Sequence, residues 1–152
     1  MSEYPVNVRV ASWLGAKCIR HFCLQRNIEF PELLEFCEYI ESIVSTYDVP
    51  EWDAKGETLK ISGLGQCLPS KMTSIDNLET LIQTVHEISA SQIYGAHIPE
   101  QVNAYLKKAV NISKLDIVKA YNLHSLSQID LGNEGWGEPI EQTILNESKY
   151  TT

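Results

Sequence analysis

Residues 73–90, TSIDNLETLIQTVHEISA, carry the clearest helical pattern in the chain. Thr73 or Ser74 can cap such a helix at its start, and the pattern ends near Ala90. The apolar residues recur at spacings of three and four, and they are Ile75, Leu78, Leu81, Ile82, Val85 and Ile88. This spacing predicts an α-helix that buries one face in a core.

The segments on either side carry the same period. Residues 5–27 predict a helix, with a short strand before residue 11 as the alternative. Pro31 suits the first turn of a second helix, residues 31–47, from whose apolar side Glu35 and Glu38 point away. That apolar side carries Leu33, Phe36, Cys37, Ile40, Val44 and Tyr47. Further helices are predicted at residues 99–111, 114–122 (capped by Ser113), 124–131 and 139–146, with residues 147–152 frayed.

Two connections contain too many helix breakers to continue this pattern. Residues 48–72 include Pro50, Gly56, Gly63, Gly65 and Pro69, and predict a long acidic loop with at most a short strand pair near residues 58–61. Residues 130–139 predict a glycine-rich acidic loop. The chain as a whole predicts an all-α fold, an irregular bundle of about five to seven helices in a single globular domain, residues 1–152.

The composition is that of an ordinary globular protein. Of 152 residues, 43% are hydrophobic and 21% are charged, which is enough apolar material for one core. The sequence contains neither a secretory signal nor an apolar run of membrane-spanning length, so we expect a cytoplasmic protein. In that compartment the cysteines should be reduced thiols in the core; they are Cys18, Cys23, Cys37 and Cys67.

The net charge of −8 is concentrated in two segments. Residues 28–57 hold nine carboxylates and one lysine, and residues 129–152 hold five carboxylates and one lysine. The rest of the chain is basic or near neutral. Phosphate backbones and anionic membranes bind proteins through lysine and arginine. We therefore expect neither nucleic acid nor a membrane as a partner, and expect a basic protein instead.

The sequence contains no recognisable catalytic or cofactor motif. Cys18, His21 and Cys23 come nearest to a metal site, but on a helix Cys23 points away from the other two and no second ligand pair follows. His86 and Glu87 lack the second histidine of a zinc protease, and His86 is expected to be exposed or to flank the core. We therefore expect no metal, no cofactor and no enzymatic activity. A cysteine nucleophile paired with a distant histidine stays an alternative, because such partners meet in space.

Residues 115–129 have the spacing of a helix-turn-helix motif. DNA-reading motifs of this kind supply phosphate contacts from the second helix and its flanks. No lysine or arginine occurs between residues 120 and 148, so we interpret the segment as a helical hairpin in the core.

Each acidic segment contains a tryptophan in its breaker-rich loop. Trp52 and Trp136 either fold back onto the core or stand exposed among carboxylates as anchors for a basic partner. The second interpretation gives two candidate contact surfaces. The first consists of Glu35, Glu38, Glu51, Trp52, Asp53 and Glu57, and the second of Glu134, Trp136, Glu138 and Glu141.

In size, acidity, helical content and lack of active-site motifs, the chain resembles the immunity proteins of bacterial toxin systems such as contact-dependent growth inhibition. The resemblance spans the whole chain at the level of class and rests on no diagnostic motif, so it transfers no binding residue. It implies a cytoplasmic inhibitor, monomeric apart from its complex, that neutralises one cognate basic toxin domain, with a nuclease as the expected kind.

The residues leave two other classes of function open. The first is a helical adaptor or regulatory module that binds a basic cellular protein through the same acidic surfaces. The second is a thiol- or carboxylate-dependent enzyme of an unrecognised family.

Overall fold

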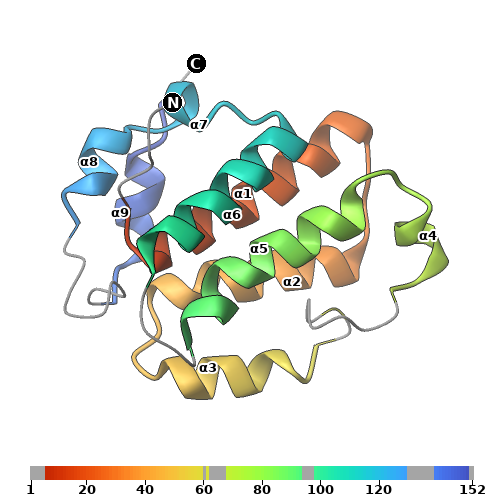
Figure 1. Ribbon diagram of the computed structural model, residues 1–152, viewed down its shortest axis with the longest axis horizontal. Helices are drawn as coiled ribbons and strands as arrows, with labels where there is room; N and C mark the ends of the chain where they lie inside the picture. The colour runs from red at the N-terminus through yellow and green to blue at the C-terminus, as the bar shows by residue number, and fades with distance from the viewer. Residues whose placement is uncertain (1–5, 60, 62–67, 94–97, 130–138, 151–152) are drawn as a thin grey trace.

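The computed structural model describes residues 6–59, 61, 68–93, 98–129 and 139–150 (Figure 1). Within this part of the chain there are nine α-helices, one 3-10 helix and no strand, so the all-α prediction is confirmed with more helices than expected. The strand pair proposed near residues 58–61 is wrong for residues 58 and 59, which lie in the turn after α3. The elements are α1 (Val8–Arg26), α2 (Pro31–Glu41), η1 (Ser42–Val44), α3 (Val49–Gly56), α4 (Ser70–Thr73), α5 (Leu78–Ile93), α6 (Pro99–Ser113), α7 (Ile117–Ala120), α8 (Leu123–Ser127) and α9 (Gln142–Glu147).

Helix α1 is the centre of the bundle. It packs against α2, α5 and α6, and Figure 1 shows α6 lying along it with α5 beside α6. The helix predicted for residues 5–27 is therefore present, but its first half is buried on every side rather than along one face. Asn7 closes this buried end by accepting a hydrogen bond from the Val10 amide at 2.8 Å.

A buried arginine joins α1 to the chain that follows α2. Arg9 Nη1 donates to the carbonyl oxygens of Ile43 at 2.6 Å and Thr46 at 2.8 Å. These carbonyls lie at the end of a helical segment, where helix dipoles concentrate negative potential. Arg9 therefore fixes the position of residues 43–46 relative to α1.

The helix predicted for residues 31–47 is shorter than its apolar pattern indicated. It ends at Glu41 and tightens into η1, so Tyr47 is not on a buried face as predicted but has 90% of its surface exposed. The acidic loop predicted from residue 48 is also wrong at its start, because residues 49–56 form α3. Asp48 caps α3 by accepting from the Glu51 amide at 3.0 Å, and Pro50 stands in the first turn.

Helix α5 follows the apolar period of residues 73–90, but the cap predicted for it at Thr73 or Ser74 is wrong. Residues 70–73 form the separate short helix α4, and α5 begins only after Asn77, whose φ of 71° turns the chain. Ser113 is likewise the last residue of α6 and not the cap of the next helix, which Asp116 caps.

The C-terminal segment is held in place rather than frayed at residues 148–150. The Asn122 amide donates to the Ser148 carbonyl at 2.8 Å, and the Tyr150 amide donates to the Ala120 carbonyl at 2.9 Å. Helices α7 and α8 have four and five residues, so residues 115–129 hold two consecutive short helices, but most of this segment is exposed or half-buried and not in the core as predicted.

Candidate functional site

A groove of about 600 Å³ lies between α2 and α3, and it gathers part of the first predicted contact surface. Glu35 and Glu38 line it from the exposed side of α2, as the helical period predicted, and Glu51 lines it from the first turn of α3. The rest of its lining is Tyr39, Ser42, Ser45, Thr46, Tyr47, Asp48, Trp52, Lys55, Thr58 and Leu59. We call this feature the acidic groove.

The charge of the acidic groove is strongly negative. Among the described residues its lining contains four carboxylates, Glu35, Glu38, Asp48 and Glu51, against the ammonium group of Lys55. All four carboxylates are solvent-exposed. Charges of one sign along a concave surface concentrate the field there, so the groove attracts cationic groups.

Trp52 closes the floor of the groove and is not the exposed anchor that was one of its two predicted roles. Only 5% of its surface is exposed. Its indole ring stacks on the Tyr39 ring with centroids 4.3 Å apart and an angle of 5° between the planes. Trp52 Nε1 donates to the Tyr39 carbonyl and to Ser42 Oγ, each at 3.0 Å, while Tyr39 Oη donates to the Trp52 carbonyl at 3.0 Å. This reciprocal pair fixes α3 against α2 and so sets the width of the groove.

Gly56 permits this close approach of the two helices. A Cβ atom at this position would overlap the Oη and Cζ atoms of Tyr39. The glycine that looked like a helix breaker is therefore the last residue of α3, and it is needed there because a larger residue would displace the Tyr39 ring.

The remaining predicted contact residues lie outside the groove lining or outside the described residues. Asp53 is half-buried and its charge acts on His86, and Glu57 is exposed at the end of α3. Glu141 is exposed beside the end of α2, because the Ile140 amide donates to the Val44 carbonyl and Gln142 Nε2 donates to the Glu41 carbonyl. Glu134, Trp136 and Glu138, with the glycine-rich loop predicted for residues 130–139 except Pro139, fall outside the described residues.

Like Asp48, Tyr47 lines the groove without being among the predicted contact residues. It is a large aromatic side chain beside the carboxylates, and it is almost fully exposed. The signal that locates it is the sequence Asp48-Val49-Pro50-Glu51, which has the form of a helix cap and predicts that the preceding helix has already ended.

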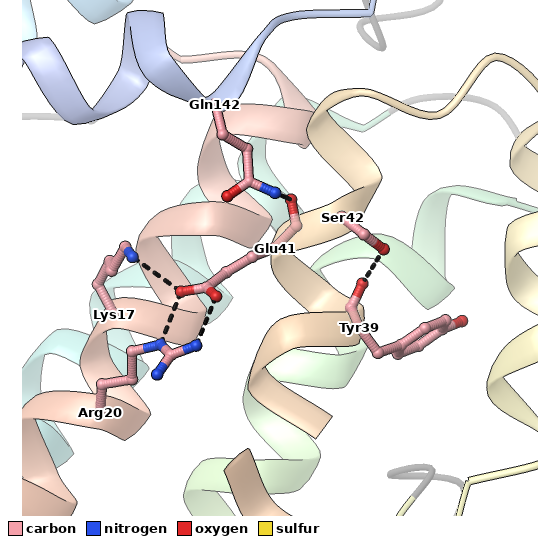
Figure 2. Close-up of polar contacts among 6 residues, drawn as sticks. All are labelled: Lys17, Arg20, Tyr39, Glu41, Ser42 and Gln142. Atoms are coloured by element: carbon pink, nitrogen blue, oxygen red, sulfur yellow. Dashed lines mark hydrogen bonds and ion pairs between the residues drawn. The ribbon is translucent and has the colours of Figure 1, made fainter. Parts of the chain in front are cut away.

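Glu41 lies on the other side of α2 and has a different environment (Figure 2). Its side chain is only 6% exposed. Arg20 forms hydrogen bonds to both of its carboxylate oxygens, with Nε donating to Oε2 at 2.8 Å and Nη2 donating to Oε1 at 2.7 Å. Lys17 Nζ lies 2.8 Å from Oε2. Burial disfavours the carboxylate, but the hydrogen bonds from Arg20 and Lys17 outweigh it, so the pKa of Glu41 is lowered.

The described thiols have the chemistry of core residues. Burial raises the pKa of Cys18 to about 11 and that of Cys37 to about 12, and it also raises the pKa of Cys23. Nucleophilic cysteines require the opposite shift. Among the described residues no group of three His, Cys, Asp or Glu side chains could hold a metal ion.

His86 is buried rather than exposed or flanking. Burial lowers its pKa although Glu87 and Asp53 act in the opposite direction, and its Nδ1 has no hydrogen-bond partner among the described residues.

The chain matches no family model, and the comparisons with curated proteins and with solved structures also gave no match. None of the helices in the described part of the chain has the length and apolar character needed to cross a membrane.

Proposed function

We propose that this protein is an immunity protein that binds and neutralises a cognate basic toxin domain, of which a nuclease is the kind best matched by charge. The observation that carries the proposal is the acidic groove, in which Glu35, Glu38 and Glu51 are brought together from two helices. A nuclease holds phosphates in a positive cleft. A protein that presents carboxylates in a fixed arrangement can occupy or cover such a cleft.

The groove combines the two contributions that a fast and tight inhibitor needs. Exposed carboxylates steer a basic partner and raise its association rate. Tyr47 offers a large exposed ring beside them, and aromatic residues of this kind supply much of the binding energy at protein interfaces. The stack of Tyr39 on Trp52 holds the groove walls in place, so little conformational freedom is lost on binding.

The proposal predicts that a basic toxin domain is encoded beside the gene for this protein, and the experiment uses that domain. That domain is expressed with and without this protein, its toxicity to cells is scored, and the association rate of the purified pair is measured between about 50 and 300 mM salt. Changing Glu35, Glu38 and Glu51 together to glutamine should lower the association rate about tenfold at low salt and flatten its salt dependence. Tyr47→Ala should instead raise the dissociation rate.

A matched variant separates the groove from net charge. Asp76→Asn, Glu100→Gln and Glu147→Gln together remove the same three charges at exposed positions outside the groove lining. This control should change the association rate by less than about twofold. Equal effects of the two triple variants would contradict the groove as the binding site. Binding of a basic protein without any loss of toxicity would favour the adaptor alternative.

A further inference from the structure

A second pocket, of about 370 Å³, lies between α1, the connections around α7 and the C-terminal segment. It shares no lining residue with the acidic groove. The residues that give it its chemistry are Trp13, Lys17, Arg20, His21, Tyr121 and Lys149. Its volume is in the range of sites for small molecules.

The charge of this pocket is opposite to that of the groove. Lys17, Arg20 and Lys149 line it, and none of the described residues in its lining is a carboxylate. Glu41 satisfies Lys17 and two of the guanidinium nitrogens of Arg20 from one side (Figure 2). Glu41 pairs with two of the three cationic side chains of the lining, Lys17 and Arg20, and Glu38 acts on Arg20 from farther away, so the charge of Lys149 gives the pocket an excess of positive charge. An acidic protein that retains such an excess in one cavity offers an anion a local site.

Two aromatic residues add neutral hydrogen-bond donors. Burial raises the pKa of Tyr121 to about 12, so its phenol keeps its proton at neutral pH. Trp13 is fully buried, and its Nε1 has no hydrogen-bond partner among the described residues. A buried N–H without an acceptor costs stability, and an acceptor atom of a bound molecule would remove that cost. The Trp13 and Tyr121 rings pack edge to face, with centroids 5.4 Å apart and 74° between their planes, and Lys17 Nζ lies 4.7 Å from the centroid of the Trp13 ring.

We propose that this pocket binds a small organic anion, with a carboxylate or phosphate head among the basic side chains and an apolar body. The head accepts hydrogen bonds from Lys149 and from the donors that Glu41 leaves free. The apolar body lies against Leu24, whose surface is 74% exposed, and against Leu115 and Tyr121 in the pocket lining. This site is independent of the proposed inhibitor function.

The test follows the indole N–H signal of Trp13 by NMR in the full chain. The signal is assigned by elimination with Trp52→Phe and Trp136→Phe, so that the core residue Trp13 stays in place. The probes are benzoate, phenyl phosphate, inorganic phosphate and the uncharged benzyl alcohol. We expect benzoate or phenyl phosphate to shift the Trp13 signal saturably, with a Kd below about 1 mM, and to leave the Trp52 signal in place. Whichever of the two binds more tightly identifies the head group.

Matched lysine variants locate the head of the anion. Lys149→Gln should weaken binding about tenfold, and Lys114→Gln, at an exposed lysine outside the pocket, should leave it unchanged. The proposal is overturned if neither organic anion binds with a Kd below about 1 mM, or if both lysine variants weaken binding equally. It is also overturned if benzyl alcohol binds as tightly as the anions, or if inorganic phosphate binds as tightly as phenyl phosphate.

Discussion

The two sides of α2 use the same type of residue for opposite purposes. On the side toward α1, Glu41 is buried and forms ion pairs with Arg20 and Lys17. Its charge is therefore neutralised inside the fold. On the side toward α3, Glu35 and Glu38 are exposed and their charges act on the solvent. The net charge of a segment therefore says little about its surface until each carboxylate is assigned to one side or the other.

Helical geometry explains how three glutamates at equal spacing come to differ. A step of three residues rotates a side chain by about 60° short of a full turn. Two such steps, from Glu35 through Glu38 to Glu41, move the carboxylate about 120° around α2. The rotation carries the third carboxylate from the solvent to the interface with α1. Figure 2 shows Glu41 and Tyr39 pointing to opposite sides of this helix.

The largest expected effect is on the side toward α3. Trp52→Ala should lower the free energy of unfolding by about 3 kcal/mol, because it removes a buried ring together with the hydrogen bonds from its Nε1 to the Tyr39 carbonyl and to Ser42 Oγ. Trp52→Phe keeps a ring for the stack and should cost only about 1 kcal/mol. Urea denaturation followed by circular dichroism measures both. Wild-type stability in Trp52→Ala would show that the residue is an exposed anchor after all.

Removing the charge of Glu41, on the side of α2 toward α1, should lower the free energy of unfolding slightly less. Glu41→Gln leaves Lys17 and Arg20 facing a neutral amide, and we expect a loss of about 2 kcal/mol, reduced from the cost at a fully buried pair because both cations are partly exposed. Glu38→Gln on the same helix is the matched control and should change the unfolding free energy by less than about 0.5 kcal/mol. Similar losses in the two variants would remove the distinction between the sides.

The pH dependence of this difference tests its electrostatic origin. The pKa of Glu41 is lowered from 4.5, so the folded state holds this proton less tightly than the unfolded state. Its contribution to stability is therefore present above pH 4.5 and is lost as the pH falls through the lowered pKa. The stability difference between wild type and Glu41→Gln should shrink as the pH falls below 4.5. A difference that stays constant over this range would show that packing, not charge, is what Glu41 contributes.

A third variant tests the close approach of α3 to Tyr39. Alanine normally favours a helix over glycine, but Gly56→Ala should destabilise the protein by about 1 to 2 kcal/mol, because its Cβ would overlap the Tyr39 ring. In a Tyr39→Leu background the same change should cost little, since the ring is gone. A double-mutant cycle in urea measures the coupling. Additive costs would mean that Gly56 and Tyr39 do not constrain each other.

Helices with a strong apolar period could be predicted from the sequence. Features that depend on contacts with residues far away in the sequence could not. The stripe of α5 and the outward direction of Glu35 and Glu38 followed from spacing alone. The burial of Arg9 and Glu41 did not, because each depends on a partner more than twenty residues away. Helix α3 was missed because Pro50 and Gly56 were counted as breakers. In the fold, Pro50 lies in the first turn of α3, and Gly56 leaves room for the Tyr39 ring.

The smallest expected effect concerns His86, which lies on α5 and whose pKa responds to Asp53 on α3. Its pKa is lowered from 6.5 by burial, so the unfolded state binds the proton more readily. Stability should therefore decline as the pH falls from about 7 through 6.5 toward the lowered pKa, by less than about 1 kcal/mol. His86→Gln should remove this decline. The loss of stability that Glu41 causes below pH 4.5 should remain. Urea midpoints at half-unit pH steps resolve the two windows, and a variant that keeps the decline above pH 5 would assign it to another group. If the two losses separate, α5 contributes its own acid sensitivity, distinct from the ion pair that joins α2 to α1.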